Sequence, residues 1–409
     1  MIVWEAAGHK RGAERRRDAA VDSESSGPLT GVRVLDLTRV VMGPLATQVL
    51  ADQGADVVVV ESLTGDTNRV MGPGPHPELS GVSLNLLRNK RSVALDLRDE
   101  RARAEVRRLV ASADVLVTTM RPQALRGLGL DYATVRELKS DLIYCQGQGF
   151  RLDGPHADAP AYDDIMQAAT GVGHVTAEAF GEPRLLPTVL ADKACGLMMA
   201  QAVSAALYAR ERNGQGCHIE IPMEESMIAF MLVEHGAGAV AGTGADGTAE
   251  SAGYARILTP QRRPQRTADG WIQMLPYLPQ HYGAIFKAST DPDEAGIDES
   301  RYRDRRSAIA NSEGLYRDLH RIATQRTTED WLAFCRKNEI PVSRVRSLDD
   351  LVRTLRIENH PEVGPYHVLP GMARFDAGGT PVRRHAPLIG GDTESMVWVP
   401  FPSAPVSVE

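Results

Sequence analysis

The strongest constraint on this chain is an alternation of apolar runs and helical patterns that begins near residue 32 and continues to about residue 150. Apolar runs predict strands at residues 32–37, 56–61, 92–97, 114–118 and 142–146, with helical patterns between them at 45–53, 99–111 and 133–139. Strands that alternate with helices at such short intervals form βαβ units, whose strands are parallel and whose crossovers are right-handed. The sequence therefore predicts a doubly wound, Rossmann-like α/β domain.

Ligands of such a sheet bind beyond the carboxyl ends of its strands. The residues that follow the predicted strands are therefore the first candidates for a site: Arg39, Val41, Glu61, Thr119, Met120 and Gln148. The turn after the first strand is not G-x-G-x-x-G, so the dinucleotide-binding fingerprint is absent.

The remainder of the chain divides by composition. Residues 1–28 mix basic and acidic residues without an apolar segment, and we expect a disordered extension. A large domain is expected over 29–225, a Gly/Ala-rich linker over 226–255, and a smaller α+β domain over 256–338. Residues 339–409 are Pro/Gly-rich with short strands, so we expect a second linker and a return to the large domain.

The bulk properties exclude several classes of protein. The net charge of -7 gives no overall basic character, which argues against a nucleic-acid partner. No run of about 18 apolar residues is present, so no membrane-spanning helix is expected. The four cysteines lack CxxC spacing and clustered histidines, which argues against a metal site or a disulfide framework and favours a reducing, cytoplasmic location.

Asp192 occupies a conspicuous position in the second half of the predicted large domain. An apolar run at residues 189–191 precedes it, and a helical pattern rich in small residues extends from 193 to about 212. An aspartate in this place is expected to cap the helix, because its carboxylate can accept from the free N–H groups of the first turn. The positive end of the helix dipole also favours the ionised form. From these residues alone, a purely structural cap is the more common interpretation.

The ordered motifs of the chain carry a resemblance. They include GPLTGVRVLDLTRVVMGP, NKRSVALDL, YDDIMQAATG, the segment around Asp192 with ALYARERNGQG, RTADGWIQMLPY and APLIGGDTE. In this order and spacing the chain resembles the family III CoA-transferases, the family of formyl-CoA transferase and carnitine CoA-transferase. The resemblance extends from about residue 28 to about residue 394.

The resemblance implies an architecture and a set of partners. It implies a large domain built from both chain ends, a small domain in the middle, and a homodimer whose two subunits are interlocked. The expected substrates are an acyl-CoA and a carboxylic acid, with no tightly bound cofactor.

The resemblance also implies roles for individual residues. Asp192 matches the family's nucleophile, which attacks the thioester to give a mixed anhydride and then an aspartyl-CoA thioester. Neighbouring backbone N–H groups are expected to bind the oxyanion. Asp163 matches an acidic residue that assists this chemistry, although it could simply cap the helix that follows it. Expected CoA contacts are Arg39, Lys90 and Arg91 for the phosphates, and Val41, Met120, Leu128, Tyr162 and Met223 for the adenine and pantetheine.

Two alternatives remain at this point. The related α-methylacyl-CoA racemases carry a histidine where this chain has Asp163, and a carboxylate does not have the pKa near 7 that their proton transfer needs. A CoA-binding protein without turnover would not need Asp192. The glycine-rich lid of the formyl-CoA enzymes has no counterpart in residues 255–266, so the substrate is expected to differ from oxalate and formate, and the acyl donor and the acceptor acid stay open. Within that segment Arg262, Arg263 and Arg266 could meet an anionic substrate or form an ordinary charged surface.

Overall fold

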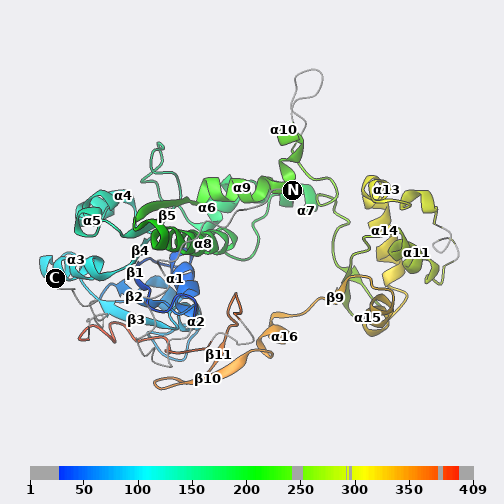
Figure 1. Ribbon diagram of the computed structural model, residues 1–409. Helices are drawn as coiled ribbons and strands as arrows, with labels where there is room; N and C mark the ends of the chain where they lie inside the picture. Colours follow the sequence, from blue (N-terminus) through cyan, green and yellow to red (C-terminus); the bar gives the residue numbers. More distant parts are fainter. Residues whose placement is uncertain (1–26, 242–251, 292, 294–296, 376–380, 396–409) are drawn as a thin grey trace, which may run out of the picture.

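The computed structural model describes residues 27–241, 252–291, 293, 297–375 and 381–395. The expected disordered extension, 1–28, lies almost entirely outside these residues. The large lobe is built on a six-stranded sheet whose neighbouring strands are all parallel, in the order β3-β2-β1-β4-β5-β6 (Figure 1). The strands are β1 (Arg33–Leu37), β2 (Asp56–Glu61), β3 (Lys90–Ala94), β4 (Val115–Thr118), β5 (Ile143–Gln148) and β6 (Cys217–Pro222).

Helices cover both faces of this sheet, which is why strands such as β2 are almost wholly apolar. One face is covered by α1 (Met42–Asp52) and α8 (Leu190–Asn213), and the other by α3 (Glu100–Ser112), α4 (Pro122–Leu128) and α5 (Tyr132–Leu138). The strand order reverses between β1 and β4, and a doubly wound sheet opens its ligand crevice at that point. The doubly wound prediction is confirmed.

The contact between α1 and α8 fixes the position of the predicted nucleophile. A Cβ atom at Gly196 of α8 would lie 2.5 Å from the Met42 carbonyl oxygen of α1, so glycine alone allows this approach. Asp192 lies one helical turn before Gly196 in α8. The close approach of the two helices therefore holds Asp192 above the carboxyl ends of the central strands.

Several short elements were not foreseen. Between β2 and β3 lie a 3-10 turn, η1 (Thr67–Val70), and α2 (Gly81–Leu86), which Ser80 caps by accepting from the Ser83 N–H. After α6 (Asp163–Ala169) comes α7 (Val172–Phe180). The predicted linker, 226–255, is helical at its start, in α9 (Met223–His235) and α10 (Ala237–Ala241), and its part from 242 to 251 lies outside the described residues.

The small lobe stands apart from the large one (Figure 1). It holds an antiparallel sheet of β7 (Gln265–Arg266), β8 (Trp271–Met274) and β9 (Val342–Arg344), with α11 (Pro279–Lys287), η2 (Glu299–Arg301), α13 (Arg305–Ala310), α14 (Ser312–Ala323) and α15 (Thr328–Lys337). Its core is built around the fully buried Trp331, Phe286 and Tyr316.

The chain then returns to the large lobe. After α16 (Leu348–Val352), the hairpin of β10 (Arg356–His360) and β11 (Gly364–Val368) packs Tyr366 and Val368 against Val59 of β2 and Leu79. Further on, the Asp392 N–H donates to the Ser92 carbonyl at 2.9 Å, so the last described segment covers the outer edge of β3.

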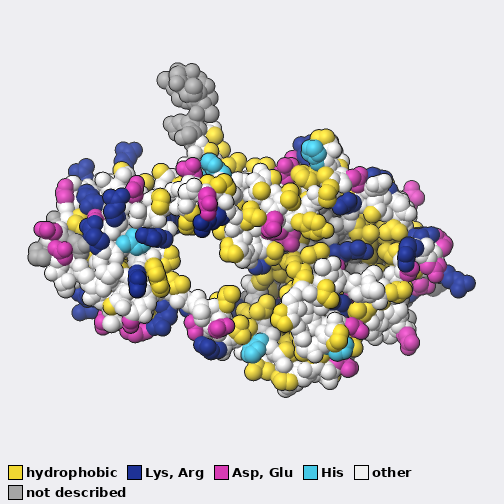
Figure 2. All heavy atoms as spheres, turned by 180° about the vertical axis from the view of Figure 1, so that it is seen from behind, with side chains coloured by type: hydrophobic (Ala, Val, Ile, Leu, Met, Phe, Trp, Pro, Cys, Tyr) yellow, Lys and Arg dark blue, Asp and Glu magenta, His cyan; other side chains and the backbone are white. Residues whose placement is uncertain are grey.

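Two connecting segments join the lobes, one before β7 and one after β9, and an opening passes between them (Figures 1 and 2). Within the described ranges, no helix combines the length and the apolar character that crossing a membrane requires.

Candidate active site

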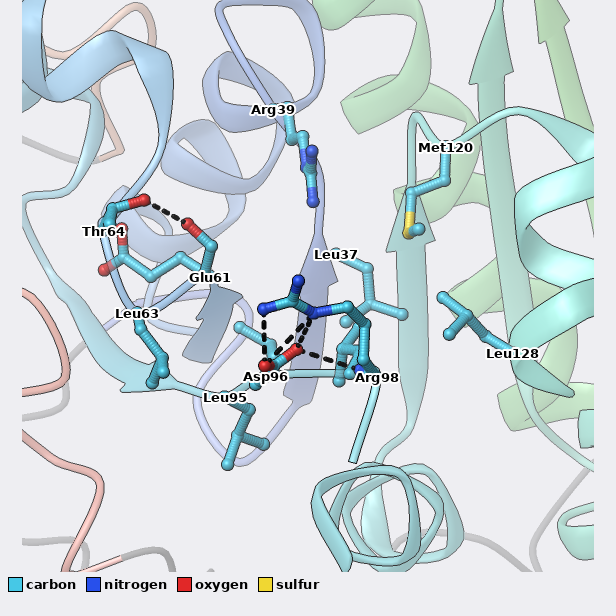
Figure 3. A pocket seen from close by; sticks show the side chains of 13 residues that line it. Leu37, Arg39, Glu61, Leu63, Thr64, Leu95, Asp96, Arg98, Met120 and Leu128 are labelled. Carbon is cyan, nitrogen blue, oxygen red and sulfur yellow. Dashed lines mark hydrogen bonds and ion pairs between the residues drawn. The ribbon is translucent and has the colours of Figure 1, made fainter. Parts of the chain in front are cut away.

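Two hollows of about 330 Å³ each adjoin at the carboxyl ends of the central strands. The outer hollow is lined by residues that follow β1, β2, β3 and β4, among them Leu63, Leu95, Met120 and Leu128 (Figure 3). The inner hollow reaches from the same edge of the sheet to the head of α8. Arg39 and Met120 line both hollows, so the two form one continuous depression.

The inner hollow is lined by most of the site residues that were predicted from the sequence. These are Arg39, Val41, Met120, Tyr162, Asp192 and Met223. Leu128 lines only the outer hollow. Seven of the ten nominated residues therefore lie along one depression, although they are spread over 185 positions of the chain from residue 39 to residue 223.

Two arginines face the outer hollow. Arg39 is exposed and points into it from the rim (Figure 3), and it has no ion-pair partner among the described residues. Arg98 is paired with Asp96 at 2.8 Å, and its side chain is 91% exposed. Sequence analysis missed Arg98. Arg98 could have been predicted from its position four residues beyond the end of β3. The parallel strands β1 and β3 end at the same edge of the sheet, so residues that follow β3 lie near those that follow β1.

Asp192 lies in the first turn of α8 and is not its N-cap, which is Val189. Its partly buried side chain lines the inner hollow. Burial, followed by the negative charge of Asp163, raises the pKa of the Asp192 carboxyl to about 6. A carboxylate with this pKa is still largely ionised at neutral pH and is more basic than an ordinary aspartate, which favours nucleophilic attack.

Asp163 is buried and holds the backbone of the first turn of α8. Its Oδ1 accepts from the Asp192 N–H at 3.0 Å, and its Oδ2 accepts from Nε2 of Gln167 at 2.6 Å. Asp163 is the first residue of α6, whose N-cap is Tyr162, so its carboxylate does not cap α6 and instead joins Gln167 of α6 to the backbone of α8. The Asp192 N–H is therefore occupied and is not available to an oxyanion.

Lys90 does not belong to the phosphate-binding set. Its side chain is fully buried, and its Nζ donates to Asp36 at 3.1 Å, to Thr47 at 2.7 Å and to the Pro44 carbonyl at 2.9 Å. Burial lowers the pKa of Lys90 and the neighbouring Asp36 opposes that shift. This pair ties β3 to β1 and α1 inside the domain.

Arg91 is also misplaced for a ligand contact. It pairs with Asp56, the first residue of β2. Both Lys90 and Arg91 open β3, because the strand begins two residues earlier than its apolar run suggests. They therefore lie at the amino end of a parallel strand, whereas ligands gather at the carboxyl end.

Val40 has a left-handed backbone conformation, which was not predicted from the sequence. Its φ is 67°, which a β-branched residue rarely adopts. The turn is fixed from both sides, since the Val40 N–H donates to Asp66 at 3.0 Å and its carbonyl accepts from Asn68 at 3.3 Å. Because Val40 lines the inner hollow, the strain lies between the arginine at the rim and the nucleophile.

The site offers carboxylate chemistry through Asp192. No three side chains of His, Cys, Asp or Glu gather as a metal ion would require anywhere in the described ranges. A partly buried carboxylate of raised pKa, at the end of an apolar depression with arginines at its far end, suits attack on the carbonyl of a long anionic thioester.

Comparison with known proteins agrees with this geometry. A family model described as CoA-transferase family III matches residues 29–393. A succinyl-CoA:glutarate CoA-transferase of Mus musculus is 30% identical over 385 residues, which cover 92% of this chain and 87% of that protein. An acetyl-CoA:oxalate CoA-transferase of Acetobacter aceti is 32% identical over 328 residues, with 78% and 81% covered.

Solved structures show the same fold. The crystal structure of an aspartate-to-alanine mutant of a Mycobacterium tuberculosis protein superimposes with a TM-score of 0.76 at 27% identity. The match covers 91% of this chain and 99% of that one.

Proposed function

Because this chain belongs to CoA-transferase family III, we propose that it moves CoA from an acyl-CoA thioester to a carboxylic acid through Asp192. The observation that carries the proposal is the position of Asp192. Its carboxylate is partly buried, has a raised pKa, and lines a depression that continues to the arginines at the sheet's carboxyl edge.

The chemistry balances without any further reagent. A carboxylate oxygen of Asp192 attacks the thioester carbonyl, the C–S bond breaks, and CoA leaves as the thiolate while a mixed anhydride remains on the enzyme. The thiolate attacks the aspartyl carbonyl of the anhydride and releases the donor acid. The acceptor carboxylate then attacks the aspartyl-CoA thioester, which gives a second mixed anhydride and expels the CoA thiolate. The thiolate attacks the acceptor's carbonyl in that anhydride, so that the acceptor leaves as its CoA thioester and the Asp192 carboxylate is regenerated. The thioester's free energy is retained because water never receives the acyl group.

The two hollows suit the two ends of CoA. We place the phosphates and adenine in the outer hollow near Arg39 and Leu128, and the pantetheine along Val41, Met120, Tyr162 and Met223 toward Asp192. One guanidinium group can donate hydrogen bonds to two phosphate oxygens at once. Arg39 forms no ion pair within the described residues, so its guanidinium can bind a phosphate. CoA is thus a substrate that enters and leaves and not a resident cofactor.

Asp163 supports transfer in preference to racemisation. A racemase needs a second group that exchanges protons with the α-carbon. Both oxygens of Asp163 are already occupied as acceptors, one by a backbone N–H and one by the Gln167 amide. The residue therefore acts as a fixed anchor in this proposal.

We propose dicarboxylic acids and their monothioesters as the first substrates to examine. The mouse and Acetobacter relatives are named for succinyl-CoA with glutarate and for acetyl-CoA with oxalate. Glutarate and oxalate both carry a second carboxylate.

We also propose that two copies of the chain form an interlocked homodimer. The opening between the lobes is wide enough to be seen through (Figure 2). Near it, α9 exposes Phe230 and Val233, at 47% and 78%. Apolar groups in such a row usually face a partner. All four cysteines are free thiols, which suits the cytoplasm as the proposed location.

The test is to trap the covalent intermediate. Incubation with a panel of acyl-CoAs, followed by digestion and mass analysis, should place CoA on the peptide that contains Asp192. Asp192→Ala should lose the adduct and transfer while still binding CoA, and Asp164→Asn, which changes the exposed neighbour of Asp163, should behave like the wild type. Transfer that persists in Asp192→Ala would contradict the mechanism.

A further inference from the structure

The segment that leads into α8 is poorly supported by its own neighbours. Every residue from 181 to 188 is exposed, and the chain there contains Pro183 and Pro187. Close to α8 its backbone hydrogen bonds are short-range, from Thr188 N–H to the Leu186 carbonyl and from Leu190 N–H to the Thr188 carbonyl. The hydroxyl of Thr176 in α7 holds the segment only further back, where it accepts from the Arg184 N–H at 2.9 Å and donates to the Arg184 carbonyl at 2.6 Å. Such a segment would position the first turn of a helix only loosely. Another contact must hold the nucleophile's turn in place.

That contact is the side chain of Gln167. It is fully buried in α6, and its amide uses both of its polar atoms. Its Oε1 accepts from the Leu186 N–H at 2.9 Å, and its Nε2 donates to the Thr188 carbonyl at 3.0 Å. One amide thus clamps the exposed segment at two backbone positions, two and four residues ahead of Leu190, where α8 begins.

The same amide also orients Asp163. Nε2 of Gln167 donates to Oδ2 of Asp163 at 2.6 Å, across one turn of α6. The other oxygen of Asp163 accepts from the Asp192 N–H at 3.0 Å. A continuous chain of hydrogen bonds therefore runs from Gln167 through Asp163 to the backbone of Asp192. Fully satisfied buried networks of this kind hold their members in one arrangement.

We infer that Gln167 is a positioning residue for the transfer reaction: its amide fixes both the segment before α8 and the Asp163 carboxylate, and so sets where the Asp192 carboxylate meets the thioester. The inference rests on the proposed function of Asp192. Gln167 does not line either hollow and touches no substrate in this arrangement. Its loss should therefore slow the chemical step and leave CoA binding intact.

Exchanging the two hydrogen-bonding groups tests this inference. Gln167→Glu replaces the donor facing Asp163 with a carboxylate, so two negative groups meet at the same short distance and the clamp opens. Adding Asp163→Asn restores a donor and an acceptor between residues 163 and 167 in reversed order, whereas the Thr188 carbonyl still lacks its donor, so the rescue is partial. The double variant, D163N with Q167E, has the same net charge as the wild type. The matched control is Gln201→Glu, the same replacement at an exposed position of α8.

The expected result separates chemistry from binding. Gln167→Glu should lower kcat by about 10- to 100-fold, the range for a misplaced catalytic group, with KM for the acyl-CoA within about twofold of wild type. The double variant should recover at least half of the loss on a logarithmic scale. Gln201→Glu should be unchanged.

Two outcomes would overturn the inference. One is an unchanged kcat in Gln167→Glu. The other is a double variant as slow as the single one when thermal unfolding shows that both are folded. If Gln167→Glu fails to fold, Gln167→Met, which keeps the length and removes both polar atoms, takes its place, and an unchanged kcat in that folded variant would overturn the inference. Failure of the proposed function would appear differently, as the absence of a CoA adduct on Asp192 in the wild-type protein.

Discussion

At the scale of single residues, the pair Asp163 and Asp192 shows how one fold uses two carboxylates differently. Asp163 is buried and bound by two donors, whereas Asp192 is partly buried, lines the hollow and has a pKa raised to about 6. The charge of the first contributes to the pKa of the second. The anchor therefore also makes the nucleophile more basic.

This pKa predicts the pH dependence of transfer. Only ionised Asp192 attacks, and a raised pKa extends the pH range in which the group is protonated. The rate should therefore be level above about pH 6 and should fall as the pH decreases through 6. Asp163→Asn removes the negative charge that faces Asp192, so the midpoint should move to lower pH. The measurement is kcat/KM against pH for the best donor.

The control for this profile is Asp164→Asn, whose carboxylate is exposed and belongs to the same turn of α6. Its midpoint should equal that of the wild type. A wild-type midpoint near 4, the ordinary value of an aspartate, would contradict the assigned environment of Asp192.

The predicted site residues that follow a strand line the hollows, whereas those that precede one lie elsewhere. Arg39, Val41 and Met120 come after β1 and β4 and line the hollows. Lys90 and Arg91 looked equally suitable as cations, but they precede the predicted strand at 92–97 and open the observed β3, so they lie at the end of the strand away from the hollows. Charge type carries no information about which end of a strand a residue occupies.

At the scale of elements, the site depends on how closely α1 and α8 approach. Gly196→Ala should destabilise the protein by about 1–3 kcal/mol, the usual cost of overpacking, because the new Cβ would meet the Met42 carbonyl at 2.5 Å. Transfer should slow as well, since the shift displaces the turn that carries Asp192. Denaturant unfolding and kcat measure the two effects.

The matched control is Gly127→Ala in α4, where an added Cβ meets nothing within 4 Å. That change should leave stability equal or raise it by up to about 1 kcal/mol, since alanine favours a helix. An equal effect of the two substitutions would show that the α1–α8 approach does not matter.

Long apolar runs made the sheet predictable, because only a strand covered on both faces tolerates a sequence such as residues 56–61. The short helices α2, α4 and α7 were missed. Their sequences contain glycine or proline and too few turns for a helical period to show, and tertiary packing decides their conformation.

At the scale of the whole molecule, the two lobes and the opening between them lead to a prediction about assembly. The protein should migrate as a dimer at micromolar concentration, and Phe230→Asp on α9 should weaken it, because a charge replaces an exposed apolar group near the opening. Light scattering coupled to size-exclusion chromatography measures the mass. Leu138→Asp on α5, a comparably exposed leucine at 44%, should leave the dimer intact. A wild-type monomer would contradict the interlocked arrangement.

The packing of the return segment has a consequence for how the protein is made. Val59 and Leu79 belong to the first quarter of the chain, yet they are covered by Tyr366, Val368 and Ala386. The ribosome therefore supplies all six strands and then the whole small lobe before it supplies the residues that cover this side of the sheet. During that interval an apolar face and the edge of β3 are uncovered in the nascent chain, where chaperones would find them. The first domain to be started is the last to be completed.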